Sequence, residues 1–224
     1  MNGVLVINKS RDITSFKVIE KLRSHLKVQK MGHAGTLDPL ATGVLVVCLG
    51  SATKLVDQFM NQEKEYVGAI KLGEETTTDD REGKIISAIT LPSGLSKEVI
   101  EKAAFSFVGE ILQRPPYFSA VKKNGRRLYE YARAGQYIDV PARPVIITKF
   151  DITEIKLPFI KFAIVCSKGT YVRAIARDMG KMLGVGGHLY DLERTRSGKF
   201  HISSAHYLSS ILQESPEKAP LHML

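Results

Sequence analysis

The stretch Gly32–Leu45 reads GHAGTLDPLATGVL, and it carries more structural information than any other part of the chain. It joins a loop with three glycines and one proline to an apolar strand, which we expect over Gly43–Leu49. Pro39 disfavours helical geometry at Asp38, the residue before it. The glycines let the backbone pass close to a ligand or to another segment. We therefore expect a long loop that presents one carboxylate at the mouth of a buried strand.

Outside this loop, apolar runs of strand length alternate with stretches that have the apolar spacing of helices. The alternation predicts an α/β or α+β domain with a mixed sheet flanked by helices. Strands are predicted over Gly3–Asn8, Gly43–Leu49, Glu65–Leu72, Val145–Lys156 and Phe159–Cys166. Helices are predicted over Thr14–Leu26, Ser51–Met60, Ser96–Phe105, Arg126–Ala134 and Thr170–Leu183. The residues expected to face the core are Phe16, Ile19 and Leu22 in the first helix and Val172, Ile175, Ala176, Met179 and Leu183 in the last.

The composition is that of a globular protein, with 224 residues of which 44% are hydrophobic and 25% charged. We expect one domain over residues 1–200 and a C-terminal tail over residues 201–224. Cys48 and Cys166 each lie inside an apolar run, which favours reduced thiols in the core. The histidines show no metal-ligand spacing, so no metal is expected.

The charge balance is basic, because 32 Lys and Arg residues exceed 23 Asp and Glu residues and give a net charge of +9. Such an excess favours a polyanionic partner, either a nucleic acid or an acidic membrane surface. A protein that is basic without such a partner is the alternative. No apolar run reaches the length of about 20 residues that spans a bilayer, and the N-terminus does not resemble a signal peptide. We expect a cytoplasmic protein.

Three groups of residues could carry chemistry. Asp38 could act as a nucleophile or base, or it could form a turn. Tyr66 could stack on a base, or it could be a core aromatic. The segment Ser167–Arg173 is a strand-to-helix turn, and Lys168 and Arg173 add positive charge to it. It could bind a phosphate or keep a carboxylate ionised, or it could be a solvated helix start.

Basic and aromatic side chains alternate between Arg114 and Arg133. Cations interleaved with aromatics in loops suit RNA or single strands with unstacked bases. Solvated helix faces are the alternative for part of this set. The chain lacks the motifs of α/β-hydrolases, P-loop enzymes, dinucleotide-binding folds and zinc deaminases. The members of this basic set are Arg114, Lys122, Lys123, Arg126, Arg127 and Arg133, with Tyr117, Phe118, Tyr129 and Tyr131 between them.

GHAGTLDPLATGVL closely resembles the signature of the TruB family of tRNA pseudouridine synthases. Further segments that resemble this family follow in order from about Gly3 to Phe200. They are Lys64–Tyr66, LGEETTTDDREG, QRPPYFSAVKKNGRRLYEYARAG, CSKGTYVRAIARDMG and Leu189–Arg194. The resemblance implies a pseudouridine-synthase fold over residues 1–200, with a mixed, largely antiparallel sheet, flanking helices and a central active-site cleft. It also implies isomerisation of uridine 55 in the tRNA T loop to pseudouridine, without metal or cofactor.

The resemblance also implies roles for individual residues. Asp38 matches the catalytic aspartate, proposed as nucleophile or base. Tyr66 matches a tyrosine that stacks on the flipped base and is proposed to take the C5 proton. Arg173 matches the arginine that pairs with the catalytic aspartate. The residues that match substrate-binding positions are Tyr171 and Leu192 in the uracil pocket, His33 beside the extruded T-loop nucleotides, and Lys9 in a motif that braces the site.

Two departures from the family pattern stand out. The proline and glycine usual after the lysine of the N-terminal motif are absent from Lys9–Ser15. Bacterial members usually carry a C-terminal PUA-type domain, and the residues after Phe200 are too few for one, so we expect a short form. We expect a monomer that binds the T-arm of tRNA without an obligatory protein partner. The alternative is a non-catalytic module that binds and folds tRNA.

Overall fold

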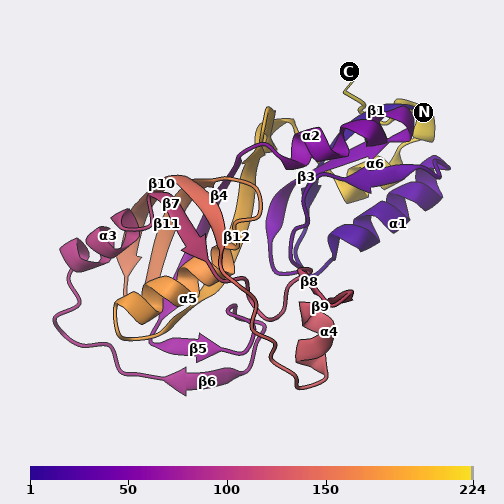
Figure 1. Ribbon diagram of the computed structural model, residues 1–224. Coiled ribbons are helices and arrows are strands. Elements are labelled where there is room, and N and C mark those ends of the chain that lie inside the picture. Colours follow the sequence, from indigo (N-terminus) through magenta and orange to yellow (C-terminus); the bar gives the residue numbers. More distant parts are fainter. Residues whose placement is uncertain (223–224) are drawn as a thin grey trace. The chain divides into compact units, whose positions relative to one another are not determined.

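The computed structural model describes residues 1–222, and the chain forms two compact units. Figure 1 labels their main helices and strands. Unit 1 consists of Met1–Val67 and Leu192–Leu224, and unit 2 consists of Gly68–Asp191. Along the chain, unit 2 is therefore an insertion into unit 1. Two strands pass from one unit into the other, namely β4 (Lys64–Leu72) and β12 (Gly187–Ser197).

The sheet of unit 1 is built on two antiparallel strands, β1 (Gly3–Lys9) and β3 (Thr42–Leu49), whose continuous apolar runs are buried. Their register places Gly3 opposite Leu49 and Lys9 opposite Gly43. Strand β14 is parallel to β1, β2 is antiparallel to β3, and the end of β12 is parallel to β3 with Arg194 opposite Gly43. Apart from β4 and β12, the elements of unit 1 in chain order are β1 (Gly3–Lys9), α1 (Ser15–Leu26), β2 (Met31–His33), β3 (Thr42–Leu49), the 3₁₀ helix η1 (Gly50–Leu55), α2 (Val56–Met60), β13 (Phe200–His201), η2 (Ile202–Ser204), β14 (His206–Tyr207), α6 (Leu208–Gln213) and η3 (Pro216–Lys218).

Helix α1 begins at Ser15 because the Thr14 hydroxyl accepts a hydrogen bond from the backbone N–H of Lys17. Phe16 is 63% exposed, so the prediction that it faces the core is wrong. The buried stripe of α1 starts at Ser15 and leaves Phe16 beside it. Ser15 is held in this position because its hydroxyl is hydrogen-bonded to the backbone of Leu37. The buried residues of α1 are Ser15, Val18, Ile19, Leu22 and Leu26.

In unit 2, strand β10 (Arg143–Lys156) is antiparallel to both β11 (Phe159–Cys166) and β7 (Gly109–Gln113). These strands continue the sheet order β4-β11-β10-β7. The strand pairs β5–β6 and β8–β9 form two small antiparallel sheets. Phe150 packs edge-on against Phe107 and Phe162 in the core. Apart from β4 and β12, the elements of unit 2 in chain order are β5 (Glu74–Thr76), β6 (Ile85–Ala88), α3 (Lys97–Phe105), β7 (Gly109–Gln113), β8 (Lys122–Lys123), β9 (Arg126–Arg127), α4 (Leu128–Arg133), β10 (Arg143–Lys156), β11 (Phe159–Cys166) and α5 (Val172–Met182).

The predicted α+β class and the five predicted strands are confirmed. Helix α5 buries Val172, Ile175, Ala176 and Met179 as expected, whereas Leu183 follows the helix end and is half-buried. The helix predicted to start at Arg126 starts at Leu128, because Arg126 and Arg127 pair with β8 instead. The helix predicted over Ser51–Met60 divides into η1 and α2.

Cys48 and Cys166 are buried in β3 and β11, as predicted. Burial raises the pKa of the Cys48 thiol to about 11, so this thiol stays protonated near neutral pH. Among the described residues, no helix has both the length and the apolar composition that a membrane span requires. The division into a domain over residues 1–200 and a tail over residues 201–224 stays a prediction.

Candidate active site

Asp38 lies in the loop between β2 and β3 and is half-buried. Its backbone carbonyl accepts a hydrogen bond from the N–H of Ala41 at 3.1 Å, so residues 38–41 form a turn. Pro39 occupies the second position of that turn, where its fixed φ is favourable. Asp38 therefore takes part in a turn through its backbone, and the role of its carboxylate stays a prediction.

Lys9 holds this loop from the end of β1. Its ammonium donates to the carbonyls of Ser10 at 2.9 Å, Ile13 at 2.8 Å and Pro39 at 3.3 Å. Lys9 is 0% exposed. Because the third acceptor directly follows Asp38, the lysine fixes the backbone that carries the carboxylate. The role of Lys9 in substrate binding stays a prediction.

Two more buried side chains fix the same loop. The hydroxyl of Ser15 donates to the carbonyl of Leu37 at 3.0 Å and accepts from its N–H at 2.9 Å. Arg194, on β12, donates from Nε to the carbonyl of Val44 at 2.6 Å and from Nη2 to the carbonyl of Gly35 at 3.0 Å. The loop is therefore attached at both ends as well as beside Asp38.

Tyr66 lies on β4 two residues after Lys64, and Leu192 lies on β12 two residues before Arg194. A Cβ placed on Gly35 would lie 3.4 Å from Arg194 Nη1 and 3.8 Å from Lys64 Cε, so both side chains point toward the loop. Side chains two residues apart on a strand share a face, which places Tyr66 with Lys64 and Leu192 with Arg194. Tyr66 is 9% exposed and Leu192 is 7% exposed.

His33 ends β2 opposite Val47, and its ring is half-buried. Burial lowers the pKa of this imidazole, and the nearby charge of Arg194 lowers it further. The ring is therefore neutral at physiological pH. Within residues 1–222 its buried Nδ1 has no hydrogen-bond partner, which is compatible with a polar contact made by a substrate.

Arg173 lies on the first turn of α5 in unit 2, and its side chain is 6% exposed. It donates to the carbonyl of Thr78 at 2.9 Å and to the carbonyl of Phe118 at 3.0 Å. Its Nη1 also lies 3.4 Å from a carboxylate oxygen of Asp80. The arginine is therefore a buried, oriented group and not a solvated cation at a helix start.

Asp80 and Gln113 are polar residues of this site that the sequence analysis missed, and both are buried. The Asp80 carboxylate accepts from the Thr78 hydroxyl at 2.6 Å and from the Glu82 N–H at 3.0 Å. Gln113 accepts from the N–H of Tyr171 at 2.8 Å and donates to its carbonyl at 3.1 Å, which fixes the residue that precedes α5. Both residues stand in the quoted family segments, and that placement was the available signal.

The predicted site residues divide between the two units. The predicted ion pair between Asp38 and Arg173 joins residues of different units, and it stays a prediction, as does the central cleft. Unit 1 contains Lys9, His33, Asp38, Tyr66 and Leu192, and unit 2 contains Tyr171 and Arg173.

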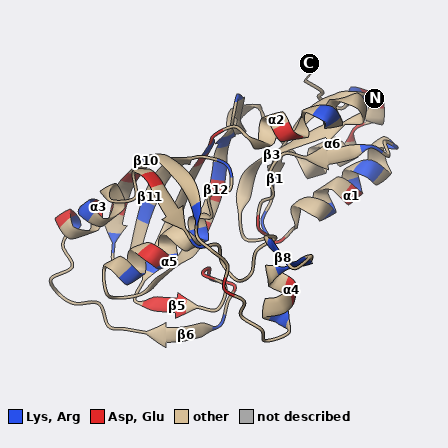
Figure 2. Cartoon of the chain, viewed as in Figure 1, with Lys and Arg blue, Asp and Glu red and all other residues tan. Residues whose placement is uncertain are grey.

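Five of the six cations in the predicted basic set lie on β8, β9 and α4 of unit 2. Strands β8 and β9 consist of two lysines and two arginines, all exposed. Arg126 lies 4.6 Å from the ring centre of Tyr131, and Arg133 lies 5.4 Å from that of Tyr129. Figure 2 shows the basic residues on β8 and α4. This feature offers cations and aromatic faces to a polyanion.

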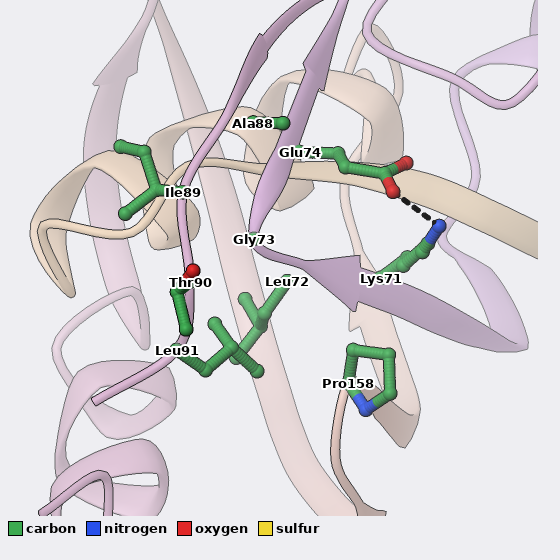
Figure 3. A pocket seen from close by; sticks show the side chains of 9 residues that line it. All are labelled: Lys71, Leu72, Gly73, Glu74, Ala88, Ile89, Thr90, Leu91 and Pro158. Carbon is green, nitrogen blue, oxygen red and sulfur yellow. Dashed lines mark hydrogen bonds and ion pairs between the residues drawn. The ribbon is translucent and has the colours of Figure 1, made fainter. Parts of the chain in front are cut away.

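Unit 2 also has a surface hollow of about 390 Å³ near the start of β5. Lys71 and Glu74 form an ion pair with an N–O distance of 2.6 Å. Figure 3 shows this pair at one side of the hollow and Leu91 at another. The predicted site residues are not among those that line it. Among residues 1–222, no group of three or more His, Cys, Asp or Glu side chains could hold a metal ion.

Comparison with known families identifies the chain along most of its length. Residues 23–172 match the N-terminal domain of the TruB family pseudouridylate synthases. Residues 173–221 match the tRNA pseudouridylate synthase B C-terminal domain. The tRNA pseudouridine synthase B of Francisella tularensis subsp. tularensis (strain WY96-3418) is 45% identical over 97% of this chain and 72% of its own length. The enzyme of the same name from Francisella philomiragia subsp. philomiragia is also 45% identical.

Solved structures confirm the predicted fold. A chain of a Cbf5-Nop10-Gar1 complex superposes with a TM-score of 0.73 and 30% identity over 94% of this chain. A chain of an H/ACA RNP bound to a substrate RNA containing 2′-deoxyuridine gives a TM-score of 0.70 and 27% identity. This protein spans 54% and 52% of those two chains. Because of these matches and its sequence motifs, the chain is assigned to one family: it belongs to the TruB family of pseudouridylate synthases.

Proposed function

We propose that the protein converts uridine 55 in the T loop of tRNA to pseudouridine, as an isomerase. The observation that carries the proposal is the fixed Asp38 loop, which is held by buried Lys9 and Arg194. Lys64 and Arg194, each two residues along its strand from Tyr66 or Leu192, approach this loop at Gly35. Relatives named tRNA pseudouridine synthase B, 45% identical over 97% of the chain, support the same substrate.

The reaction rearranges bonds within one nucleotide. The bond from N1 of uracil to C1′ of the ribose breaks, the base turns, and C5 forms the new bond to C1′. The C5 proton leaves and a proton ends on N1, so product and substrate contain the same atoms and electrons. Asp38 acts on the sugar as nucleophile or base, and it must be ionised in either role. We assign Arg173 as the group that keeps it ionised.

The target base must leave its loop before this chemistry can begin. Flipping a base costs a few kcal/mol, which stacking on an aromatic ring partly offsets. Tyr66 supplies that ring, and Tyr171 and Leu192 supply the walls of the uracil pocket. Contacts from His33 to neighbouring nucleotides and from the basic residues of β8, β9 and α4 to phosphates contribute the remaining binding free energy.

The test is tritium release from tRNA labelled at C5 of uridine. We expect release by the wild-type protein and loss of release in Asp38→Asn, which keeps the size of the side chain but removes its charge. Asp57→Asn, an equivalent change at an exposed residue of α2, is the control and should release tritium normally. Tight tRNA binding by the wild type without release would instead support the non-catalytic tRNA-folding role.

The assembly and cellular site of the protein are also proposals. We propose a monomer that acts in the cytoplasm on tRNA without an obligatory protein partner. Turnover by the purified chain alone, at a mass of 24.8 kDa by light scattering, would support this. A dimer that loses activity on dilution would contradict it.

A further inference from the structure

Helix α5 carries a second arginine, Arg177, one turn after Arg173. Its Nε donates to the carboxylate of Asp178 at 2.9 Å, and its Nη1 donates to Asp79 at 2.9 Å. Its Nη2 donates to the backbone carbonyl of Arg114 at 3.0 Å. All three nitrogens of this guanidinium are therefore hydrogen-bonded to the protein, and its side chain is 25% exposed.

The two arginines bind the same two segments of unit 2. Arg173 takes the carbonyl of Thr78 in the turn Thr77–Asp80 and the carbonyl of Phe118 in the segment Gln113–Phe118. Arg177 takes Asp79 in that turn and the carbonyl of Arg114 in that segment. We call this arrangement the α5 clamp. It holds the backbone acceptors that orient the Arg173 guanidinium.

We propose that Arg177 is a positioning residue for the isomerisation, acting through the α5 clamp to orient Arg173 without touching the RNA. The catalytic part of this inference rests on the proposed function, whereas the clamp itself does not. Without Arg177, the turn and the segment each lose an attachment, and the acceptors of Arg173 can shift. A displacement of about 1 Å in an active site can lower a rate about 100-fold.

The contact between Arg177 and Asp79 allows a test of whether Arg177 acts through the turn Thr77–Asp80. Its side chain is 16% exposed, and burial raises the pKa of the carboxyl while Arg177 opposes that rise. In Arg177→Gln the Asp79 carboxylate loses its cation and disturbs the turn. Adding Asp79→Asn removes that charge and allows an amide pair in its place. A double-mutant cycle therefore separates action through the turn from direct contact with RNA.

The experiment measures kcat, KM and tRNA dissociation constants for the wild type, Arg177→Gln, Asp79→Asn and the double variant. We expect Arg177→Gln to lower kcat by tenfold or more. Its tRNA affinity should stay within about twofold, because two carboxylates already neutralise this cation. The double variant should recover kcat to within a few-fold of Asp79→Asn. The control Lys181→Gln, the same charge change at an exposed residue of α5, should keep the wild-type kcat.

Hydrogen exchange provides a readout that is independent of turnover. Amides in Thr77–Asp80 and Gln113–Phe118 should exchange faster in Arg177→Gln, and those of α3 should not change. A normal kcat in Arg177→Gln, a loss of affinity that matches the loss of kcat, or a double variant no better than Arg177→Gln would each overturn the proposal. Wild-type protein without turnover would refute the proposed function, and exchange would still decide whether the clamp exists.

Discussion

Lys9 is a cation placed inside the core to hold a loop. Its ammonium serves three backbone carbonyls, and each buried carbonyl left without a donor costs about 1–3 kcal/mol. We predict that Lys9→Met lowers the free energy of unfolding by about 3 kcal/mol or more and lowers kcat, because the backbone next to Asp38 is released. Urea denaturation and tritium release measure the two effects. Lys21→Met, at an exposed position of α1, should change neither.

His33 makes stability depend on pH in a defined direction. Burial and then Arg194 lower the pKa of its imidazole from the ordinary value of 6.5. Below pH 6.5 the unfolded chain therefore binds a proton that the folded chain resists, and stability falls as the pH falls.

We predict that His33→Gln weakens this dependence by up to about 1.4 kcal/mol per pH unit below pH 6.5. Urea denaturation between pH 5 and 8 provides the test. The two proteins should have parallel stability curves near pH 8, where the imidazole is neutral in both states. Equal slopes at low pH would contradict the prediction.

Single residues also show where sequence reasoning stops. The position of Asp38 in a proline turn followed from its neighbours, because a turn is local. Asp80 was not identified from the sequence, because its burial depends on partners distant in the sequence, notably Arg173. Phe16 looked like a core residue, because its apolar side chain fits a helical stripe when the hydroxyl of Ser15 is ignored.

At the scale of elements, β3 and β12 meet at a glycine. A Cβ on Gly43 would lie 2.3 Å from the carbonyl oxygen of Arg194, and its φ is +95°. We predict that Gly43→Ala lowers the free energy of unfolding by more than about 3 kcal/mol, because backbone must move on backbone. Gly169 has a φ of +79° but open space around an added Cβ. We therefore expect Gly169→Ala to lower the free energy of unfolding by only about 1–2 kcal/mol. Urea denaturation of the pair provides the comparison, and equal losses would contradict it.

Strand prediction succeeded or failed according to how each strand is buried. The strands β1 and β3 are apolar along their whole length, so the sequence identified them. Strand β12 went unpredicted because its sequence, GHLYDLERTRS, has neither a continuous apolar run nor a regular alternation of apolar and polar residues. Its Arg194 is 1% exposed and serves backbone carbonyls, a role that hydrophobicity does not signal.

At the scale of the whole molecule, the net charge of +9 favours RNA binding, and the number of phosphate contacts sets the salt dependence of that binding. We predict that exchanging Lys122 and Lys123 together for glutamine reduces the slope of log affinity against log salt by about 1–2, because each phosphate contact contributes about 0.7–0.9. Filter binding over a salt series measures the slope. The same exchange at Lys149 and Lys161, both exposed and paired with acids, should leave it unchanged.

The sequence predicted the basic character of the molecule but not its division into two units. Composition is a sum over residues, so net charge needs no knowledge of the fold. The division depends on residues 1–67 packing with residues beyond 191, which no local pattern reveals. The predicted single domain over residues 1–200 followed the extent of the family motifs instead.

Unit 1 is interrupted along the chain, and this has a consequence for synthesis. Arg194 secures Gly35 and Val44, yet the ribosome makes it long after both. When the ribosome has completed unit 2, which ends at Asp191, the nascent chain still lacks Arg194. It therefore lacks the side chain that binds the loop carrying Asp38. We therefore expect the loop that carries Asp38 to become fixed only after the ribosome has added Arg194.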